Sequence, residues 1–157
     1  MVTRPLLNAG DLAAWARREG FRDLRPEAWH VSVVRAVQPF RSLCVASGAA
    51  VHIAPSSDRT VRRLGPFVAL TFESDTLTAR HHGLLAAGAT WDHPTYRPHV
   101  TFSVEPGPFL EGVSPYMGPL IFGSEEWPKR SGVDARQLQR APTCRATAST
   151  CLRQSPP

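Results

Sequence analysis

Two short stretches of the sequence carry the same reactive side chains at the same spacing. Residues 30–33 read His-Val-Ser-Val, and residues 99–102 read His-Val-Thr-Phe. In a β-strand alternate side chains point to the same face, so each stretch presents one imidazole and one hydroxyl together. The apolar residues between them would be buried on the opposite face of the strand.

If the two strands lie side by side, His30, Ser32, His99 and Thr101 converge on one face. One imidazole can then take a proton while the other gives one, and the two hydroxyls can hold the oxygens of a phosphodiester. A third match at 93–95 reads His-Pro-Thr. Proline cannot donate to a strand ladder, so we interpret this match as a loop and a chance occurrence.

Length and composition predict one soluble domain. The chain has 157 residues, of which 42% are apolar, enough for a buried core. No apolar run approaches the 18 or so residues of a membrane span, and the N-terminus lacks the pattern of a signal peptide, so we expect a cytoplasmic protein without membrane contact. Cys44, Cys144 and Cys151 have no zinc-like spacing and are odd in number, which argues against a disulfide framework.

The charge is unevenly distributed along the chain. Residues 1–127 contain 12 Arg and 12 acidic residues, whereas residues 128–157 carry the whole net charge of +5. We therefore expect a neutral catalytic domain at 1–127 and a basic tail at 128–157, which lacks apolar periodicity and is predicted to be disordered. A neutral body is not typical of a protein that binds long nucleic acids, and favours a small anionic ligand held in a local site.

The order of the expected elements indicates an α+β fold. Helices are predicted at 11–19, with Asp11 as N-cap and Gly20 as stop, and from Ser74 or Asp75 to Ala87; strands are predicted at 28–36, 51–53, 66–73, at the second histidine motif and at 120–122. Residues 1–8 are expected to be a frayed start. We predict two lobes of antiparallel sheet with helices packed outside and a central cleft.

The loop before the second motif contains Trp91 and Tyr96, whose rings could stack on a nucleobase or simply fill the core. His81 and His82 lie next to each other on the second predicted helix. Neighbouring residues do not share a helix face, so these two histidines are not expected to bind a metal.

These motifs resemble the two-histidine phosphoesterase superfamily, whose signature is two His-x-Ser/Thr strands with apolar framing. Further stretches resemble the phage anti-CBASS cyclic-oligonucleotide phosphodiesterases, which destroy the nucleotide second messengers of a bacterial antiviral system. The matching stretches are 15–21, 77–82, 96–101 and 115–125. Ser32 stands where the first motif more usually has Thr, and the hydroxyl is kept.

The resemblance implies roles for particular residues. His30 and His99 would be the acid–base pair, Ser32 and Thr101 would bind the phosphate, and the ribose 2′-hydroxyl would attack its own 3′-phosphate without a metal or another cofactor. The family also holds an adenine near its C-terminal end.

For that base the resemblance implies Glu125 and, among aromatic residues, Trp127. Tyr96 of the loop before the second motif is a further candidate for binding the base. The substrate would be a cyclic di- or trinucleotide. Two alternatives stay open, a phosphodiesterase that opens 2′,3′-cyclic phosphates at RNA ends, and a catalytically silent nucleotide-binding or virion-associated module.

Overall fold

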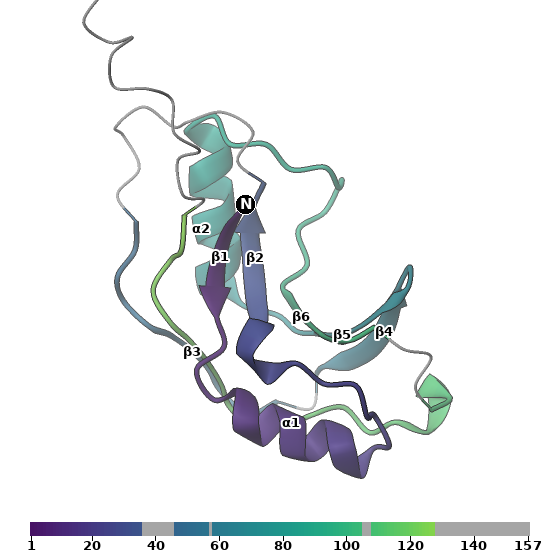
Figure 1. Cartoon of the computed structure of the whole chain (residues 1–157). Helices are drawn as coiled ribbons and strands as arrows, with labels where there is room; N and C mark the ends of the chain where they lie inside the picture. Colours follow the sequence, from purple (N-terminus) through teal and green to yellow (C-terminus); the bar gives the residue numbers. More distant parts are fainter. Residues whose placement is uncertain (36–45, 57, 105–107, 128–157) are drawn as a thin grey trace, which may run out of the picture.

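The computed structural model describes residues 1–35, 46–56, 58–104 and 108–127 (Figure 1). The strands are β1 (Val2–Pro5), β2 (His30–Val34), β3 (Val51–Ile53), β4 (Thr60–Leu64), β5 (Phe67–Thr71), β6 (His99–Ser103) and β7 (Leu120–Phe122). The helices are α1 (Ala9–Arg18) and α2 (Asp75–Ala86), with short 3-10 turns at Pro26–Ala28 and Leu110–Gly112. The predicted basic tail at 128–157 lies outside the described residues.

Five strands form one antiparallel sheet in the order β1-β2-β6-β5-β4, and β3 pairs with β7 in a separate antiparallel sheet. The predicted α+β fold with antiparallel strands is confirmed. The two strands that carry the histidine motifs, β2 and β6, are neighbours at the middle of the larger sheet.

The apolar face of the larger sheet packs against both helices. Val31, Val100 and Phe102 of the two central strands belong to one buried cluster with Trp15 of α1 and Leu77 of α2. The rings of Phe102 and Trp15 meet edge-on, with 5.3 Å between their centroids, an arrangement that adds about 0.5–1.5 kcal/mol to the gain from burial. The helices therefore leave the opposite face of β2 and β6 free to carry polar side chains.

Local signals set both ends of α2, as the sequence predicts. The Ser74 hydroxyl accepts a hydrogen bond from the backbone N–H of Leu77 at 3.3 Å and caps the first turn. Gly88 follows the helix with a φ of +98°. Glycine adopts this left-handed conformation without steric cost, so the chain can turn there into the loop that leads to β6.

α1 begins two residues earlier than the sequence predicts. Ala9 is its first residue and Asn8 occupies the N-cap position, so the prediction of Asp11 as N-cap is wrong. The Asn8 side chain donates to the Pro119 carbonyl and accepts from the backbone N–H of Ile121, both at 2.9 Å. These partners lie more than a hundred positions away, and they hold the residue that precedes the helix.

The N-terminal residues form an edge strand, so the expectation of a frayed start is wrong. β1 pairs with β2, with Thr3 opposite Ser32 and Pro5 opposite His30. On its other side, Thr3 exchanges two backbone hydrogen bonds with Glu126, at 3.1 and 2.8 Å. β4, which the sequence analysis also missed, is held in a similar way by its antiparallel pairing with β5.

A buried ion pair ties β1 to α2 and to the segment after β7. The fully buried Glu125 carboxylate accepts two hydrogen bonds from Arg80 of α2, at 2.7 and 2.8 Å. It also accepts from Arg4 of β1 at 3.2 Å and from the Ser47 N–H at 3.0 Å. Burial alone would raise the pKa of Glu125, but these donors together hold that pKa below its ordinary value.

We expect Glu125→Gln to destabilise the fold by about 3 kcal/mol or more, because Arg4 would stay buried without a carboxylate. Urea unfolding near neutral pH measures this loss. Since the folded pKa of Glu125 is lowered, its contribution is present above the ordinary carboxyl pKa and disappears as the pH falls through the folded value. The difference between wild type and variant should therefore shrink in acid.

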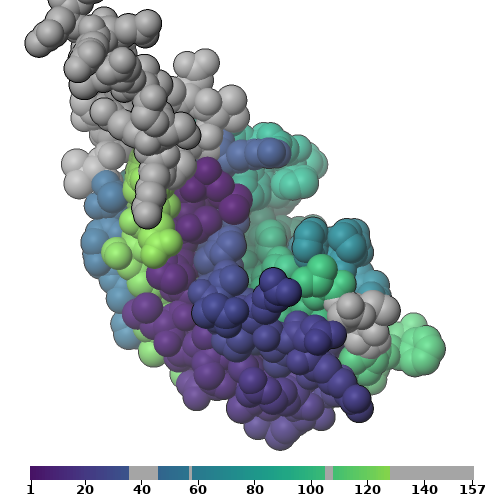
Figure 2. Space-filling view, in the orientation of Figure 1, coloured from purple at the N-terminus to yellow at the C-terminus, as the bar shows by residue number. Residues whose placement is uncertain are grey.

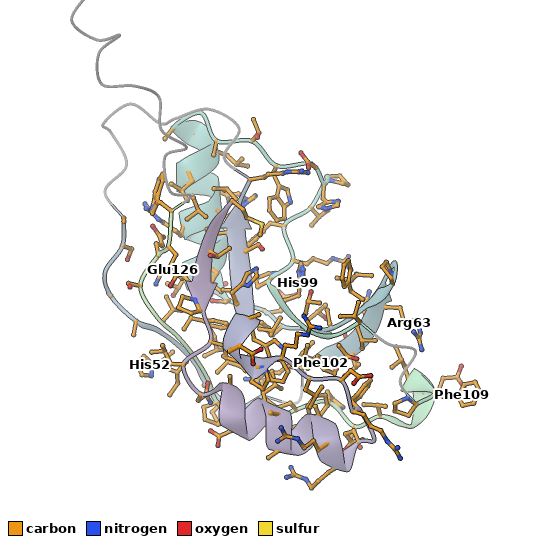
Figure 3. The ribbon with its side chains drawn as sticks, viewed as in Figure 1. His52, Arg63, His99, Phe102, Phe109 and Glu126 are labelled. Atoms are coloured by element: carbon orange, nitrogen blue, oxygen red, sulfur yellow. The ribbon has the colours of Figure 1, made fainter. Side chains whose placement is uncertain are left out.

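Glu126→Gln is the matched control. Glu126 is the next residue and its side chain is exposed (Figure 3), so its removal should change the unfolding free energy by less than about 0.5 kcal/mol. Equal unfolding curves for the two variants would contradict the structural role assigned to Glu125.

Candidate functional site

The structure brings four of the expected site residues together on the open face of β2 and β6. The two antiparallel strands pair through the central valines of the two motifs. In this register Ser32 lies across from His99, and His30 lies across from Thr101. The two histidines are therefore diagonal neighbours, with about 7 Å expected between their Cβ atoms.

Both imidazoles are oriented by the same backbone contact. Nδ1 of His30 is 2.8 Å from the Ala28 carbonyl oxygen, and Nδ1 of His99 is 2.9 Å from the Arg97 carbonyl oxygen. A carbonyl oxygen only accepts, so in each ring Nδ1 donates the proton and a neutral ring has its lone pair on Nε2. Each histidine thus presents Nε2 as the atom that can take or give a proton.

The two hydroxyls occupy different surroundings. The Ser32 hydroxyl contacts the sulfur of Met1 at 3.2 Å, while the backbone carbonyl of Ser32 accepts from the Tyr96 hydroxyl at 3.0 Å. Thr101 lines a cavity beside His99. Both hydroxyls can donate to an anion placed between the strands.

A cavity of about 540 Å³ opens beside His99 and Thr101. Its remaining lining comes from the β4–β5 hairpin and from the loop before β6, namely Arg62, Leu64, Gly65, Phe67, Thr71, Trp91, His93, Thr95 and Arg97. A second cavity of about 380 Å³ is lined by Ser32 and shares His99 with the first. On the face shown in Figure 2, the surface is hollowed between the teal hairpin and the upper teal segment, and His99 lies near the centre of Figure 3.

Tyr96 is linked to the site by a hydrogen bond to the backbone carbonyl of Ser32 on β2. Its ring stacks on buried His81, with 4.1 Å between centroids and 6° between planes, and its hydroxyl donates to the Ser32 carbonyl. Trp91 meets both rings edge-on, at 5.2 and 5.6 Å. Burial raises the pKa of Tyr96, so its hydroxyl keeps its proton and stays a donor. These contacts support a positioning role, and stacking of Tyr96 on a base stays a prediction.

The structure does not place Glu125 and Trp127 with the histidines. The Glu125 carboxylate is engaged by Arg4 and Arg80, as described above. Trp127 packs against a separate small core cluster that includes Val33. Neither residue is among those lining the two cavities beside His99, so recognition of a base by them stays a prediction.

Most residues of the cavity wall were not predicted from the sequence. Arg62, Phe67 and Thr71 come from the β4–β5 hairpin, and Arg97 comes from the loop before β6. A usable signal was the Gly-Pro dipeptide at 65–66, which is typical of a turn and separates the two strands. The match at 93–95 does lie in a loop, yet His93 lines both cavities.

The site is rich in acid–base groups and cations. Within the described ranges, no Asp or Glu lines the larger cavity, whereas Arg62 and Arg97 do. In the smaller cavity Asp92 is paired with Arg35. The arrangement can transfer protons at two points and hold an anion between them.

In the part of the chain that the structure describes, no group of three or more His, Cys, Asp or Glu residues is arranged to hold a metal ion. None of the helices there combines the length and the apolarity needed to cross a membrane.

Comparisons with known proteins assign the family. Residues 2–129 match the family model described as Anti-CBASS protein Acb1. A protein of that name from Caulobacter sp. (strain RHG1) is 34% identical over 139 residues, which cover 79% of this chain and 21% of the relative. Another, from Sphingomonas paeninsulae, is 34% identical over 135 residues, covering 79% of this chain and 22% of the relative.

The chain belongs to the Anti-CBASS protein Acb1 family. It spans about a fifth of the length of these two relatives. The resemblance to the anti-CBASS family found in the sequence is confirmed, while the wider two-histidine phosphoesterase superfamily stays a prediction.

We expect the neutral forms of His30 and His99 to be Nδ1–H tautomers, because a carbonyl oxygen faces each Nδ1. Long-range ¹⁵N–¹H correlation spectra of the imidazoles measure this directly. The exposed His52 on β3 (Figure 3) is the internal reference and should show a mixture of tautomers. Nε2–H tautomers at His30 and His99 would contradict the assignment of Nε2 as the reactive atom.

Proposed function

We propose that this domain is a metal-independent phosphodiesterase that cleaves 3′,5′ linkages in cyclic di- and trinucleotide second messengers. The observation that carries the proposal is the placement of two imidazoles and two hydroxyls on one sheet face, where His99 and Thr101 line a cavity of about 540 Å³. Membership in a family named for anti-CBASS activity supports a role against nucleotide-based immunity.

In the proposed reaction the ribose 2′-hydroxyl attacks the adjacent 3′-phosphorus. One histidine takes the 2′ proton at Nε2 as the new O2′–P bond forms. The other histidine, protonated beforehand, gives a proton to the 5′-oxygen as the P–O5′ bond breaks. The product is a linear nucleotide with a 2′,3′-cyclic phosphate end, and the two histidines exchange their protonation states.

The geometry of β2 and β6 supports this division of roles. Diagonal neighbours leave about 7 Å between the Cβ atoms of His30 and His99, space for a phosphate between the two rings. Ser32 and Thr101 each lie across from one histidine, so both can donate to the non-bridging oxygens, where negative charge grows in the transition state. Hydrogen bonds that strengthen at that point lower the barrier.

The larger cavity offers an apolar wall for a nucleobase. Leu64 and Phe67 stand at the tip of the β4–β5 hairpin, with 40% and 43% of their surface exposed, and Trp91 lines the same cavity. An aromatic ring that stacks on a base contributes about 1–3 kcal/mol to binding and tolerates different bases.

We expect His30→Ala and His99→Ala each to lower the cleavage rate of 3′,3′-cyclic GMP–AMP by about 10²–10⁴-fold, because each removes one positioned acid–base group. Chromatography of the nucleotide after incubation with the protein in EDTA measures this loss. His52→Ala is the matched control, since His52 lies on the smaller sheet and is exposed.

Three outcomes of the same assay would contradict the proposal. Cleavage retained in both histidine variants would exclude the acid–base pair. Binding of the intact nucleotide without turnover by the wild type would indicate a capture module. Turnover of RNA 2′,3′-cyclic phosphate ends alone would indicate the other phosphodiesterase reaction.

We expect Phe67→Ala to raise the KM for the cyclic dinucleotide about 5- to 100-fold, because the hairpin would lose its stacking surface. The fold should tolerate this change, since Phe67 is already 43% exposed. Phe109→Ala is the control, because Phe109 is 93% exposed on a turn that projects away from His99 (Figure 3). Equal KM values for the two variants would exclude Phe67 from base binding.

A further inference from the structure

We propose that Arg62 and Arg97 form a second phosphate subsite beside the histidine site, on the part of the sheet that also carries Thr71. The subsite would select ligands that carry two or more phosphodiester groups on one small molecule. This inference rests on the proposed function and names what that function recognises besides the reacting phosphate.

Strand register places the subsite on the same face as the histidines. Thr71 of β5 pairs with His99 of β6, and Ala69 of β5 pairs both with Thr101 and with Arg62 of β4. Directly paired residues in antiparallel strands share a face. Arg62 therefore stands two strands away from Thr101, at a backbone separation of about 10 Å.

The cavities connect this position with the histidines. Arg62, Thr71 and Arg97 line the larger cavity together with His99 and Thr101. The same three residues also line a neighbouring cavity of about 210 Å³. They thus stand where the space beside the histidines continues along the sheet, and a volume of about 540 Å³ is typical of a site for a whole small ligand.

The two guanidinium groups are available to an anion. Among the described residues, neither Arg62 nor Arg97 has a carboxylate within 4 Å, unlike Arg4, Arg35 and Arg80. Nε of Arg62 donates to the Thr60 hydroxyl at 3.1 Å, which holds the group against the strand. Its two Nη groups contact no acceptor in the described part of the chain.

The chemistry of these groups fits a phosphate. A guanidinium donates two parallel hydrogen bonds to a phosphate, and the charge makes them stronger than neutral ones. Asp58 and Glu73 line the cavity of about 210 Å³ together with these arginines, but neither of them lines the cavity of about 540 Å³ that contains His99. A cyclic dinucleotide with one phosphate between the histidines carries its second phosphate across its ring, and within the same cavity Arg62 and Arg97 would bind that second phosphate.

The test compares Arg62→Gln and Arg97→Gln with Arg63→Gln in the full chain. Arg63 is the next residue on β4, points to the opposite face and is exposed (Figure 3). Each variant is assayed with a cyclic dinucleotide, which has two phosphates, and with a dinucleoside monophosphate, which has one. The measured quantity is the ratio of kcat/KM for the two substrates.

We expect Arg62→Gln and Arg97→Gln to lower this ratio about 10-fold or more, mainly through the KM of the cyclic dinucleotide. Arg63→Gln should keep the wild-type ratio. Rescue of the ratio by Arg62→Lys, which keeps the charge, should be partial, because lysine lacks the planar pair of donors. An unchanged ratio in both glutamine variants would overturn the subsite.

A binding measurement separates failure of the proposed function from failure of the proposed subsite. If the wild type cleaves neither substrate, calorimetric binding of the intact cyclic dinucleotide decides the inference. Weaker binding by Arg62→Gln and Arg97→Gln than by Arg63→Gln would support the subsite without catalysis. Equal binding by all three variants, or no binding by the wild type, would overturn it.

Discussion

The pairing of Val31 with Val100 is the contact on which the site depends. Both valines are fully buried on the helix-covered face of the sheet, and burying such a side chain contributes about 1.5–3 kcal/mol. Alternation along the strands then sends the flanking imidazoles and hydroxyls to the open face. A slip of one residue would bury polar groups and expose the valines, so the apolar core also sets the register of the chemistry.

Polar clusters away from the cavities hold the surrounding segments in place. His81 on α2 bonds the Val33 carbonyl of β2 at 2.6 Å and stacks on Tyr96, which in turn bonds the Ser32 carbonyl. Burial lowers the pKa of His81, so the ring is neutral when it makes these contacts. The loop before β6 is thereby anchored to the strand beside it. Its far end supplies the carbonyl of Arg97 that orients His99.

The parts of the fold that local chemistry determines could be predicted from the sequence. The two histidine strands follow from alternation, and α2 follows from Ser74 and Gly88, whose preferences act within one turn. The start of α1 and the edge strand β1 could not be predicted, because Asn8 and Thr3 are held by residues more than a hundred positions away. Only part of the site could be predicted from the sequence, because only part of it is determined by a local pattern. Its central residues repeat a motif, whereas its walls come from a hairpin whose first strand is stabilised by pairing.

Residues 1–127 have no net charge, yet the larger cavity is lined by arginines and by no described carboxylate. The carboxylate of Glu125 is engaged by Arg80 and Arg4 on the helix side, and Asp92 is engaged by Arg35 at the rim of the smaller cavity. Among the described residues, no carboxylate lines the larger cavity, whereas Arg62 and Arg97 do. The field at a site depends on which charges line it and on how little water screens them, and the net charge of the domain does not determine it. A long polymer would meet a surface without overall attraction, whereas a small anion that enters the cavity meets imidazoles, hydroxyls and guanidinium groups together.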